Sequence, residues 1–172
     1  QRQMCIRDRV IMPFPNNPTG AVMEREDLEA IAEVLRGTNI MVLSDEIYAE
    51  LNYGLQNHIS IATLPGMAER TITLNSFSKN FLMTGWRVGV IIAEPEFLDV
   101  MNRINGSLVY SAPSISQRAG IQALAMRKEI REKYVTAYRD RIFYSADRIE
   151  KIPYLSLVRP KGCLLYTSDA AD

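Results

Sequence analysis

The chain lacks the features that assign a sequence to several large classes of proteins. No apolar run approaches the roughly 20 residues that a membrane-spanning helix needs, and no secretory signal is recognisable near residue 1. Lys plus Arg number 20 and Asp plus Glu number 20, so the formal net charge is zero. This balance gives no electrostatic reason to expect nucleic acid or an anionic membrane as a partner. We therefore expect a cytoplasmic protein that binds neither nucleic acid nor membrane and holds no metal.

Cysteine is scarce, and its placement is informative. The two cysteines, Cys5 and Cys163, are too few to indicate a disulfide framework. Each lies in an end segment that fits poorly with the rest of the chain, and both segments resemble translated sequencing-adapter tails. We therefore expect residues 1–9 and 163–172 to be non-native tails, and we exclude them from reasoning about the fold. The native part is then expected to be about residues 10–162, cut from a longer protein at both ends.

Predicted strands and helices alternate along the chain. Short apolar or β-branched runs predict strands, and amphipathic stretches with a period near 3.6 predict helices. The predicted strands are 10–14, 40–43, 70–74, 87–93 and 155–158, and the predicted helices are 24–36, a segment opening at Pro95, 114–126 and 129–151. This alternation indicates an α/β fold with a mostly parallel sheet flanked by helices.

The first predicted helix illustrates the pattern. Its expected core face consists of Leu28, Ile31, Val34 and Leu35. No good N-cap precedes it, because Met23 stands where Ser or Asp is preferred.

Polar side chains follow three of the predicted strands. Asn17 comes after the first strand, Asp45 after the second, and the segment 76–79 after the third. The carboxyl ends of parallel strands meet at one edge of a sheet, where ligands bind. We therefore expect these side chains to converge on one binding site.

The amine of Lys79 is the most informative group of this set. An amine that attacks a carbonyl must be partly deprotonated, and burial or a cationic neighbour favours that state. Arg87 starts the next strand, where it either acts as such a neighbour or binds an anion with its planar fork. Ser76 and Ser78 add hydroxyl groups beside the lysine. Together these groups suit a phosphate placed next to an aldehyde.

Asp45 supplies the complementary chemistry. A fixed carboxylate keeps a pyridine nitrogen protonated, which makes the ring a better electron sink. A lysine that forms an imine and a carboxylate that binds pyridinium are what pyridoxal 5'-phosphate requires of a protein. Asn17 and Tyr48 could hydrogen-bond the phenolic oxygen of the ring. Pro18 favours an extended backbone at Asn17, which directs that side chain off the strand end.

Four segments resemble the successive signatures of fold-type I aminotransferases of class I/II. In chain order they are Asn17–Gly20, Ser44–Tyr48, Ser76–Lys79 and Gly85–Gly89. The resemblance covers about residues 10–162. It implies a truncated large domain of a fold-type I pyridoxal-phosphate transferase, in which residues 10–140 belong to the cofactor-binding domain. Residues 141–162 would then be the end of the interdomain helix and the start of the small domain.

The resemblance also implies an activity and its central residues. The parent protein would transfer an amino group between an L-amino acid and a 2-oxo acid through a Schiff base of pyridoxal 5'-phosphate on Lys79. Lys79 would then move a proton between the substrate α-carbon and the cofactor. Asp45 would pair with the pyridine nitrogen.

Five further residues receive cofactor-binding roles from the resemblance. Tyr48 and Asn17 would bind the phenolic oxygen, and Ser76 and Arg87 would bind the phosphate together with Ser78. The run Met83–Arg87 resembles the bacterial and archaeal branch that acts broadly on aspartate and aromatic substrates.

The sequence departs from the family in what is missing. The family's phosphate loop and the aromatic residue that stacks on the ring precede Asn17, and its substrate-carboxylate arginine follows Gly162. We therefore expect this fragment to be inactive, and the expected activity is that of the parent. Family members are usually homodimers, and Tyr110 and the loop 53–58 are candidates to face a partner chain.

Other functions share some of these motifs. Ser76 and Lys79 also fit the S-x-x-K motif of penicillin-recognising serine enzymes, but the accompanying S-D-N and K-T-G elements do not occur. A carbon–sulfur β-lyase, a decarboxylase or the sensor domain of a transcription regulator would keep Lys79 and Asp45. His58, the sole histidine, is expected to be at the surface or behind the site, and Trp86 receives no role.

Overall fold

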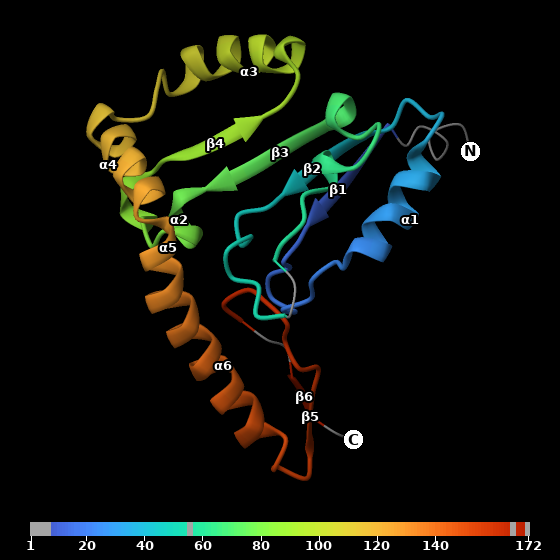
Figure 1. Cartoon of the computed structure of the whole chain (residues 1–172), viewed down its shortest axis with the longest axis vertical. Helices are drawn as coiled ribbons and strands as arrows, with labels where there is room; N and C mark the ends of the chain where they lie inside the picture. Colours follow the sequence, from blue (N-terminus) through green and yellow to red (C-terminus); the bar gives the residue numbers. More distant parts are fainter. Residues whose placement is uncertain (1–7, 55–56, 166–167, 171–172) are drawn as a thin grey trace.

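The computed structural model describes residues 8–54, 57–165 and 168–170. Cys5 and most of the predicted N-terminal tail lie outside these residues. The chain contains a four-stranded sheet. Figure 1 shows α1 beside the first strand of this sheet and α3 and α4 near its last strand. The rod formed by α5 and α6 leads away from the sheet towards the pair of strands β5 and β6.

The sheet has the order β1-β2-β3-β4, which is also the order of the chain. Its strands are Arg9–Pro13, Met41–Asp45, Thr71–Ser76 and Gly89–Ile92. Strands β1, β2 and β3 are parallel, and β4 runs antiparallel to β3. The expected mostly parallel sheet flanked by helices is therefore confirmed, with one antiparallel strand at its end.

The helices follow the predicted segments closely. The α-helices are α1 (Arg25–Leu35), α2 (Phe77–Asn80), α3 (Pro95–Leu108), α4 (Ser114–Ala125), α5 (Arg127–Ile130) and α6 (Thr136–Ile149). Short 3₁₀ turns are η2 (Ile61–Thr63), η3 (Ala68–Arg70) and η4 (Thr84–Trp86), and one π-helical turn is η5 (Arg131–Val135). The single helix predicted over 129–151 is thus α5 and α6 joined through a π turn. Within the described part of the chain, none of these helices has the length and apolarity to cross a membrane.

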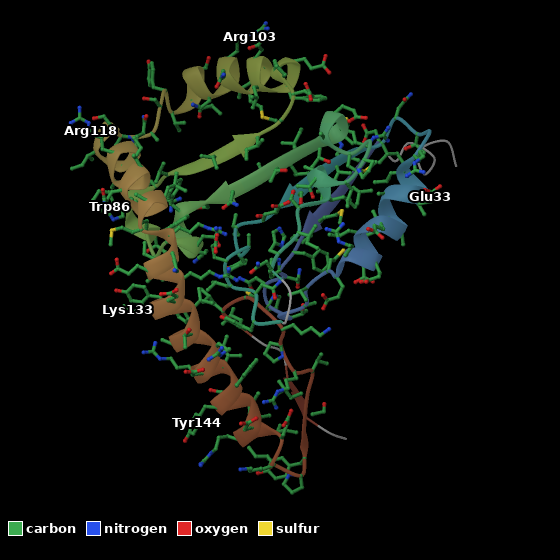
Figure 2. The ribbon with its side chains drawn as sticks, viewed as in Figure 1. Glu33, Trp86, Arg103, Arg118, Lys133 and Tyr144 are labelled. Carbon is green, nitrogen blue, oxygen red and sulfur yellow. The ribbon has the colours of Figure 1, made fainter. Side chains whose placement is uncertain are left out.

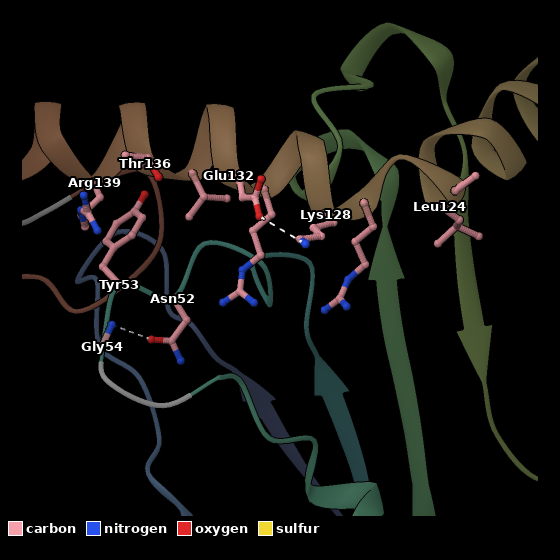
Figure 3. Close-up of a pocket in the computed structure, with 12 residues that line it drawn as sticks. Asn52, Tyr53, Gly54, Leu124, Lys128, Glu132, Thr136 and Arg139 are labelled. Atoms are coloured by element: carbon pink, nitrogen blue, oxygen red, sulfur yellow. Dashed lines mark hydrogen bonds and ion pairs between the residues drawn. The ribbon is translucent and has the colours of Figure 1, made fainter.

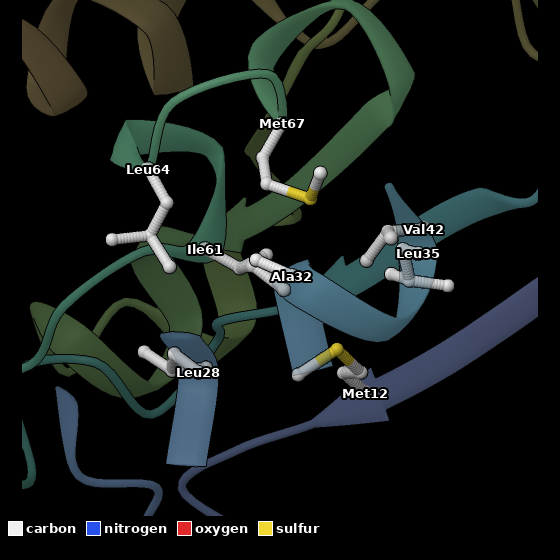
Figure 4. Close-up of a cluster of buried hydrophobic side chains, with 8 residues drawn as sticks. All are labelled: Met12, Leu28, Ala32, Leu35, Val42, Ile61, Leu64 and Met67. Carbon is white, nitrogen blue, oxygen red and sulfur yellow. The ribbon is translucent and has the colours of Figure 1, made fainter. Parts of the chain in front are cut away.

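The main core lies between α1 and the sheet. Leu28, Ala32 and Leu35 of α1 pack on Met12 of β1 and Val42 of β2, and the segment around η2 and η3 covers them (Figure 4). The covering residues are Ile61, Leu64 and Met67. Burial of these side chains removes apolar surface from water, which is the main favourable term in folding.

Two details of α1 differ from the sequence-based expectation. Val34 is 77% exposed, whereas Ala32 is buried and takes its place on the core face. The helix begins after Glu24, whose backbone N–H donates to Asp27 Oδ2 at 3.0 Å. An acidic residue at the third helical position therefore satisfies a free N–H in the absence of a Ser or Asp cap.

A second cluster joins segments that lie far apart in the sequence. Cys163 is fully buried against Tyr48 and Leu51. Nearby, the backbone N–H groups of Lys161 and Gly162 donate to Gly20 O at 2.9 and 3.0 Å. The chain continues to β6 (Ser168–Ala170), which pairs antiparallel with β5 (Leu155–Leu157). The proposed domain and tail boundaries remain predictions.

Candidate functional site

The register of the sheet brings the predicted polar residues to one edge. Pro13, Asp45 and Leu74 lie opposite one another on β1, β2 and β3. Beyond that row, the segments that follow β1 and β2 carry Asn17 and Tyr48. The segment that ends β3 and follows it is residues 76–79, called the lysine turn below. Because β4 is antiparallel, its first residue lies at this edge too, and Gly89 pairs with Ser76.

One cavity of about 400 Å³ opens at the ends of β1 and β2. Asn17, Asp45 and Tyr48 line it together with Pro13, Pro15 and Ile47. Asn17 Nδ2 donates to the hydroxyl of the buried Tyr48 at 2.9 Å. Oδ1 of the half-buried Asp45 accepts a hydrogen bond from Ile47 N at 3.3 Å. The carboxylate can accept further hydrogen bonds, so it remains available to a ligand in the cavity. The structure therefore joins three of the predicted site residues in one cavity.

The lysine turn follows β3 directly. Ser76 is the N-cap of α2, and its Oγ accepts from Ser78 N at 3.1 Å. Lys79 lies half-buried in this four-residue helix. Among the residues that the structure describes, its amine has neither a hydrogen-bond nor an ion-pair partner. The lysine turn lies on the same sheet edge as the cavity, on the next strand, and not among the residues that line the cavity.

Arg87 stands two residues before the start of β4. It adopts a left-handed backbone conformation with φ 53°, and its Nη1 donates to Thr84 O at 3.1 Å. The rest of this exposed guanidinium remains available for an anion. Gly89, two residues further along, is required by a close approach of β4 to β3, since a Cβ at this position would lie 2.9 Å from Asn75 O.

A buried carboxylate lies directly behind Asp45. Glu46 accepts from Ser44 Oγ at 2.9 Å and from Ser60 Oγ at 2.6 Å, and His58 Nε2 lies 3.1 Å from its Oε2. Burial raises the pKa of Glu46, but the contacts with His58, Ser60 and Ser44 outweigh it and leave this pKa below its ordinary value. His58 therefore lies behind Asp45, one of the two positions expected from the sequence, where it links the loop before η2 to the end of β2.

A larger cavity of about 650 Å³ lies between the loop 52–54 and the rod of α5, η5 and α6 (Figure 3). Its lining is rich in basic side chains, namely Arg127, Lys128, Arg131 and Arg139. Acidic neighbours partner several of them: Glu50 pairs with both Arg127 and Arg131, and Glu132 lies 4.0 Å from Lys128. This cavity shares no lining residue with the cavity at the strand ends.

Trp86 lies at the periphery, away from β1 and β2 (Figure 2). It is partly exposed and contributes to neither cavity. The sequence-based view that Trp86 has no cofactor role remains a prediction.

Two residues near the site carry no obvious signal in the sequence. Asn80 is buried directly after Lys79, where a polar residue in a short helix is ordinary. Glu50 has a nearly buried carboxylate in the segment that follows Tyr48. Both make hydrogen bonds or ion pairs with groups from distant parts of the chain, so only the folded structure reveals them.

Comparison with known proteins identifies the family. The family model described as aminotransferase class I and II matches residues 6–169. The chain belongs to this family. It is 41% identical over 164 residues to an aspartate aminotransferase of Pinus pinaster, a match that covers 93% of this chain and 33% of that protein.

Solved structures agree with the sequence comparison. A single mutant of Thermus thermophilus aspartate aminotransferase superposes with a TM-score of 0.84 at 33% identity, covering 91% of this chain and 41% of that one. An aromatic aminotransferase from Pyrococcus horikoshii gives 0.81 at 33% identity, covering 94% and 44%. The chain therefore spans between 33% and 44% of the length of these relatives.

Proposed function

We propose that the protein to which this chain belongs transfers an amino group between an L-amino acid and a 2-oxo acid, with pyridoxal 5'-phosphate held on Lys79. The observation that carries the proposal is the register of the sheet. Four segments that resemble the family signatures meet at one edge, with an amine, a carboxylate, an amide and a phenol among their side chains. Membership of the aminotransferase class I and II family supports the same activity.

The donor set at this edge fits the proposed cofactor. A cavity of about 400 Å³ presents the Asp45 carboxylate and the hydrogen-bonded pair of Asn17 and Tyr48, which are partners for a ring nitrogen and a phenolic oxygen. The amine of Lys79, which has no partner in the described part of the chain, suits an aldehyde. Hydroxyl and guanidinium groups on β3 and before β4 suit a phosphate.

Each residue has a defined task in this proposal. When bound, pyridoxal 5'-phosphate supplies the electron sink that makes the α-proton of an amino acid acidic. Lys79 would hold the cofactor through its Nζ and would then carry the proton from the substrate α-carbon to the cofactor. Asp45 keeps the ring nitrogen protonated. Tyr48, oriented by its bond from Asn17, donates or accepts at the phenolic oxygen.

The proposed phosphate-binding groups lie at the end of β3, in α2 and just before β4. Ser76 and Ser78 offer hydroxyl groups at the start of α2, and Arg87 offers the donors that Thr84 leaves free. A planar guanidinium fixes both the position and the charge of a phosphate, which a point charge does less well.

Substrate and assembly are part of the same proposal. Relatives named for aspartate and for aromatic substrates both resemble this chain, which supports broad specificity for these amino acids. We further propose a homodimer for the parent, with the exposed Tyr110 facing the partner chain. A parent that is a β-lyase or a decarboxylase would keep Lys79 and Asp45, so product analysis on the full-length parent distinguishes these reactions.

Covalent trapping tests the proposal on this chain directly. The purified chain is mixed with pyridoxal 5'-phosphate and reduced with borohydride, and the modified peptide is mapped by mass spectrometry. We expect a pyridoxyl group on Lys79 that disappears in Lys79→Ala. The matched control is Lys151→Ala, which removes an exposed lysine at the end of α6 and should leave the adduct in place. A chain that is folded by far-UV circular dichroism yet gives no selective adduct would contradict the assignment.

A further inference from the structure

Two asparagines flank the lysine turn, and their side chains are hydrogen-bonded to each other. Asn80 Nδ2 donates to Asn75 Oδ1 at 2.7 Å, and Ser76 N donates to the same oxygen at 2.7 Å. Asn75 precedes Ser76 at the end of β3, and Asn80 directly follows Lys79. The bond between the two side chains therefore spans the residues proposed to bind the phosphate and to hold the cofactor.

The same side chain also reaches the other half of the site. Asn80 Oδ1 accepts from Glu50 N at 3.1 Å. Glu50 belongs to the segment that continues β2 through Asp45 and Tyr48. The buried amide of Asn80 thus uses its donor on β3 and its acceptor on the continuation of β2.

The carboxylate of Glu50 forms ion pairs with two arginines of the neighbouring rod. Its carboxylate lies 2.6 Å from Arg127 Nε and 3.7 Å from Arg131 Nε. Arg131 Nη2 donates in turn to Asn57 Oδ1 at 2.8 Å. The backbone that Asn80 binds is therefore held against α5 and η5, and it is a fixed reference for the lysine turn.

Resting on the proposed function, we propose that Asn80 is a positioning residue that sets the place of the Lys79 amine relative to Asp45 and Tyr48. Helix α2 has only four residues, so its own hydrogen bonds cannot hold it in water. Its orientation must come from tertiary contacts, and Asn80 supplies hydrogen bonds to the end of β3 and to the segment that follows β2. Without this side chain, Glu50 N loses its acceptor and the turn loses its tie to Asn75.

The test separates positioning from simple stabilisation. Asn80→Ala removes both bonds, and Asn80→Asp keeps an acceptor for Glu50 N but removes the donor to Asn75. Asn102→Ala is the matched control, because it deletes an exposed amide on α3, far from the turn in the chain. All variants are compared at a temperature at which far-UV circular dichroism shows each of them folded, and Asn80→Asp serves where Asn80→Ala does not fold.

Two readouts follow Lys79 itself. The first is the concentration of pyridoxal 5'-phosphate that half-saturates borohydride-trapped labelling of Lys79. The second needs no cofactor: it is the rate of acetylation of Lys79 by acetic anhydride relative to that of the exposed Lys151, determined by mass spectrometry. We expect Asn80→Ala to raise the half-saturating concentration by about tenfold, the effect of one buried hydrogen bond, and to shift the acetylation ratio by about threefold or more.

The outcomes distinguish this inference from the proposed function. Folded Asn80 variants in which both readouts match the unsubstituted chain overturn the positioning role, even if their thermal midpoints fall. An unsubstituted chain that folds but never labels selectively at Lys79 overturns the proposed function. In that case the acetylation ratio still decides whether Asn80 holds the lysine in place.

Discussion

The two ends of the sheet differ in how well they are packed. At the β1 end, α1 buries Leu28, Ala32 and Leu35 against the sheet. At the β4 end, α3 is also amphipathic and starts with a favourable proline, yet none of its residues, all of which the structure describes, is buried. An amphipathic pattern therefore predicts a helix and its apolar side, but whether that side is covered depends on what packs against it.

The strands show the same contrast. At the first end β1 buries Met12, and burial alternates along the next strand, β2, whereas all four residues of β4 are exposed at the other end of the described sheet. The proposed site lies across this division. Asn17, Asp45 and Tyr48 come from the well-packed side, and the lysine turn and Arg87 lie where β3 meets the exposed strand. Hydrogen bonds between the two sides, such as that from Glu50 N to Asn80 Oδ1, are therefore most important where these sides meet.

Matched leucine truncations in the two helices give the largest expected effect. Leu28 in α1 is 3% exposed and Leu108 in α3 is 74% exposed. We expect Leu28→Ala to lower the free energy of unfolding by about 2–5 kcal/mol, because it leaves a cavity in the core. Leu108→Ala should change it by less than about 0.5 kcal/mol. Urea titrations followed by circular dichroism measure both, and equal losses would break the comparison.

Matched glycine substitutions sharpen the comparison at the β4 end. An added Cβ at Gly89 would lie 2.9 Å from Asn75 O, so Gly89→Ala should push β4 from β3 and cost about 1–3 kcal/mol. A Cβ at Gly106 in α3 would meet nothing within 4 Å. There alanine should stabilise by about 0.5–1 kcal/mol, because glycine is the poorer helix former. A denaturation midpoint for Gly89→Ala at or above that of the unsubstituted chain would show that the close approach of β3 and β4 contributes little.

The buried Glu46 gives a smaller effect that depends on pH. Its folded-state pKa lies below the ordinary value of 4.5, so the carboxylate stabilises the fold fully above that value. This contribution is lost as the pH falls through the lowered pKa. Glu46→Gln should cost about 1–2 kcal/mol at pH 7, because Ser44, Ser60 and His58 lose a charged partner.

The pH profile distinguishes Glu46 from a surface carboxylate. Urea midpoints between pH 3 and 7 should fall less steeply on acidification for Glu46→Gln than for the unsubstituted chain. Glu33→Gln on the exposed side of α1, where Glu33 pairs with Arg36, is the control and should leave the slope unchanged. Parallel profiles for Glu46→Gln and the unsubstituted chain would show that this buried carboxylate does not set acid stability.

Much of the site could be predicted because its residues stand next to strand ends. Asp45 and Ser76 each end a strand, so the parallel pairing of β1, β2 and β3 was enough to place them at one edge. The direction of β4 could not be read from its apolar run, since a parallel and an antiparallel strand have the same composition there. Only the antiparallel pairing brings Gly89 opposite Ser76, and Arg87 with it to this edge.

Local sequence patterns were sufficient to predict the order of strands and helices, the apolar side of α1 and the polar residues at or after the ends of β1, β2 and β3. These are local properties, set by side-chain periodicity and by the chemistry of neighbouring residues. Only the folded structure shows that Ala32, and not Val34, enters the core. It also shows that Glu46 accepts a hydrogen bond from Ser60 Oγ and that Asn80 accepts one from Glu50 N. Those outcomes depend on segments that meet only after folding, and no local pattern records which partners will meet there.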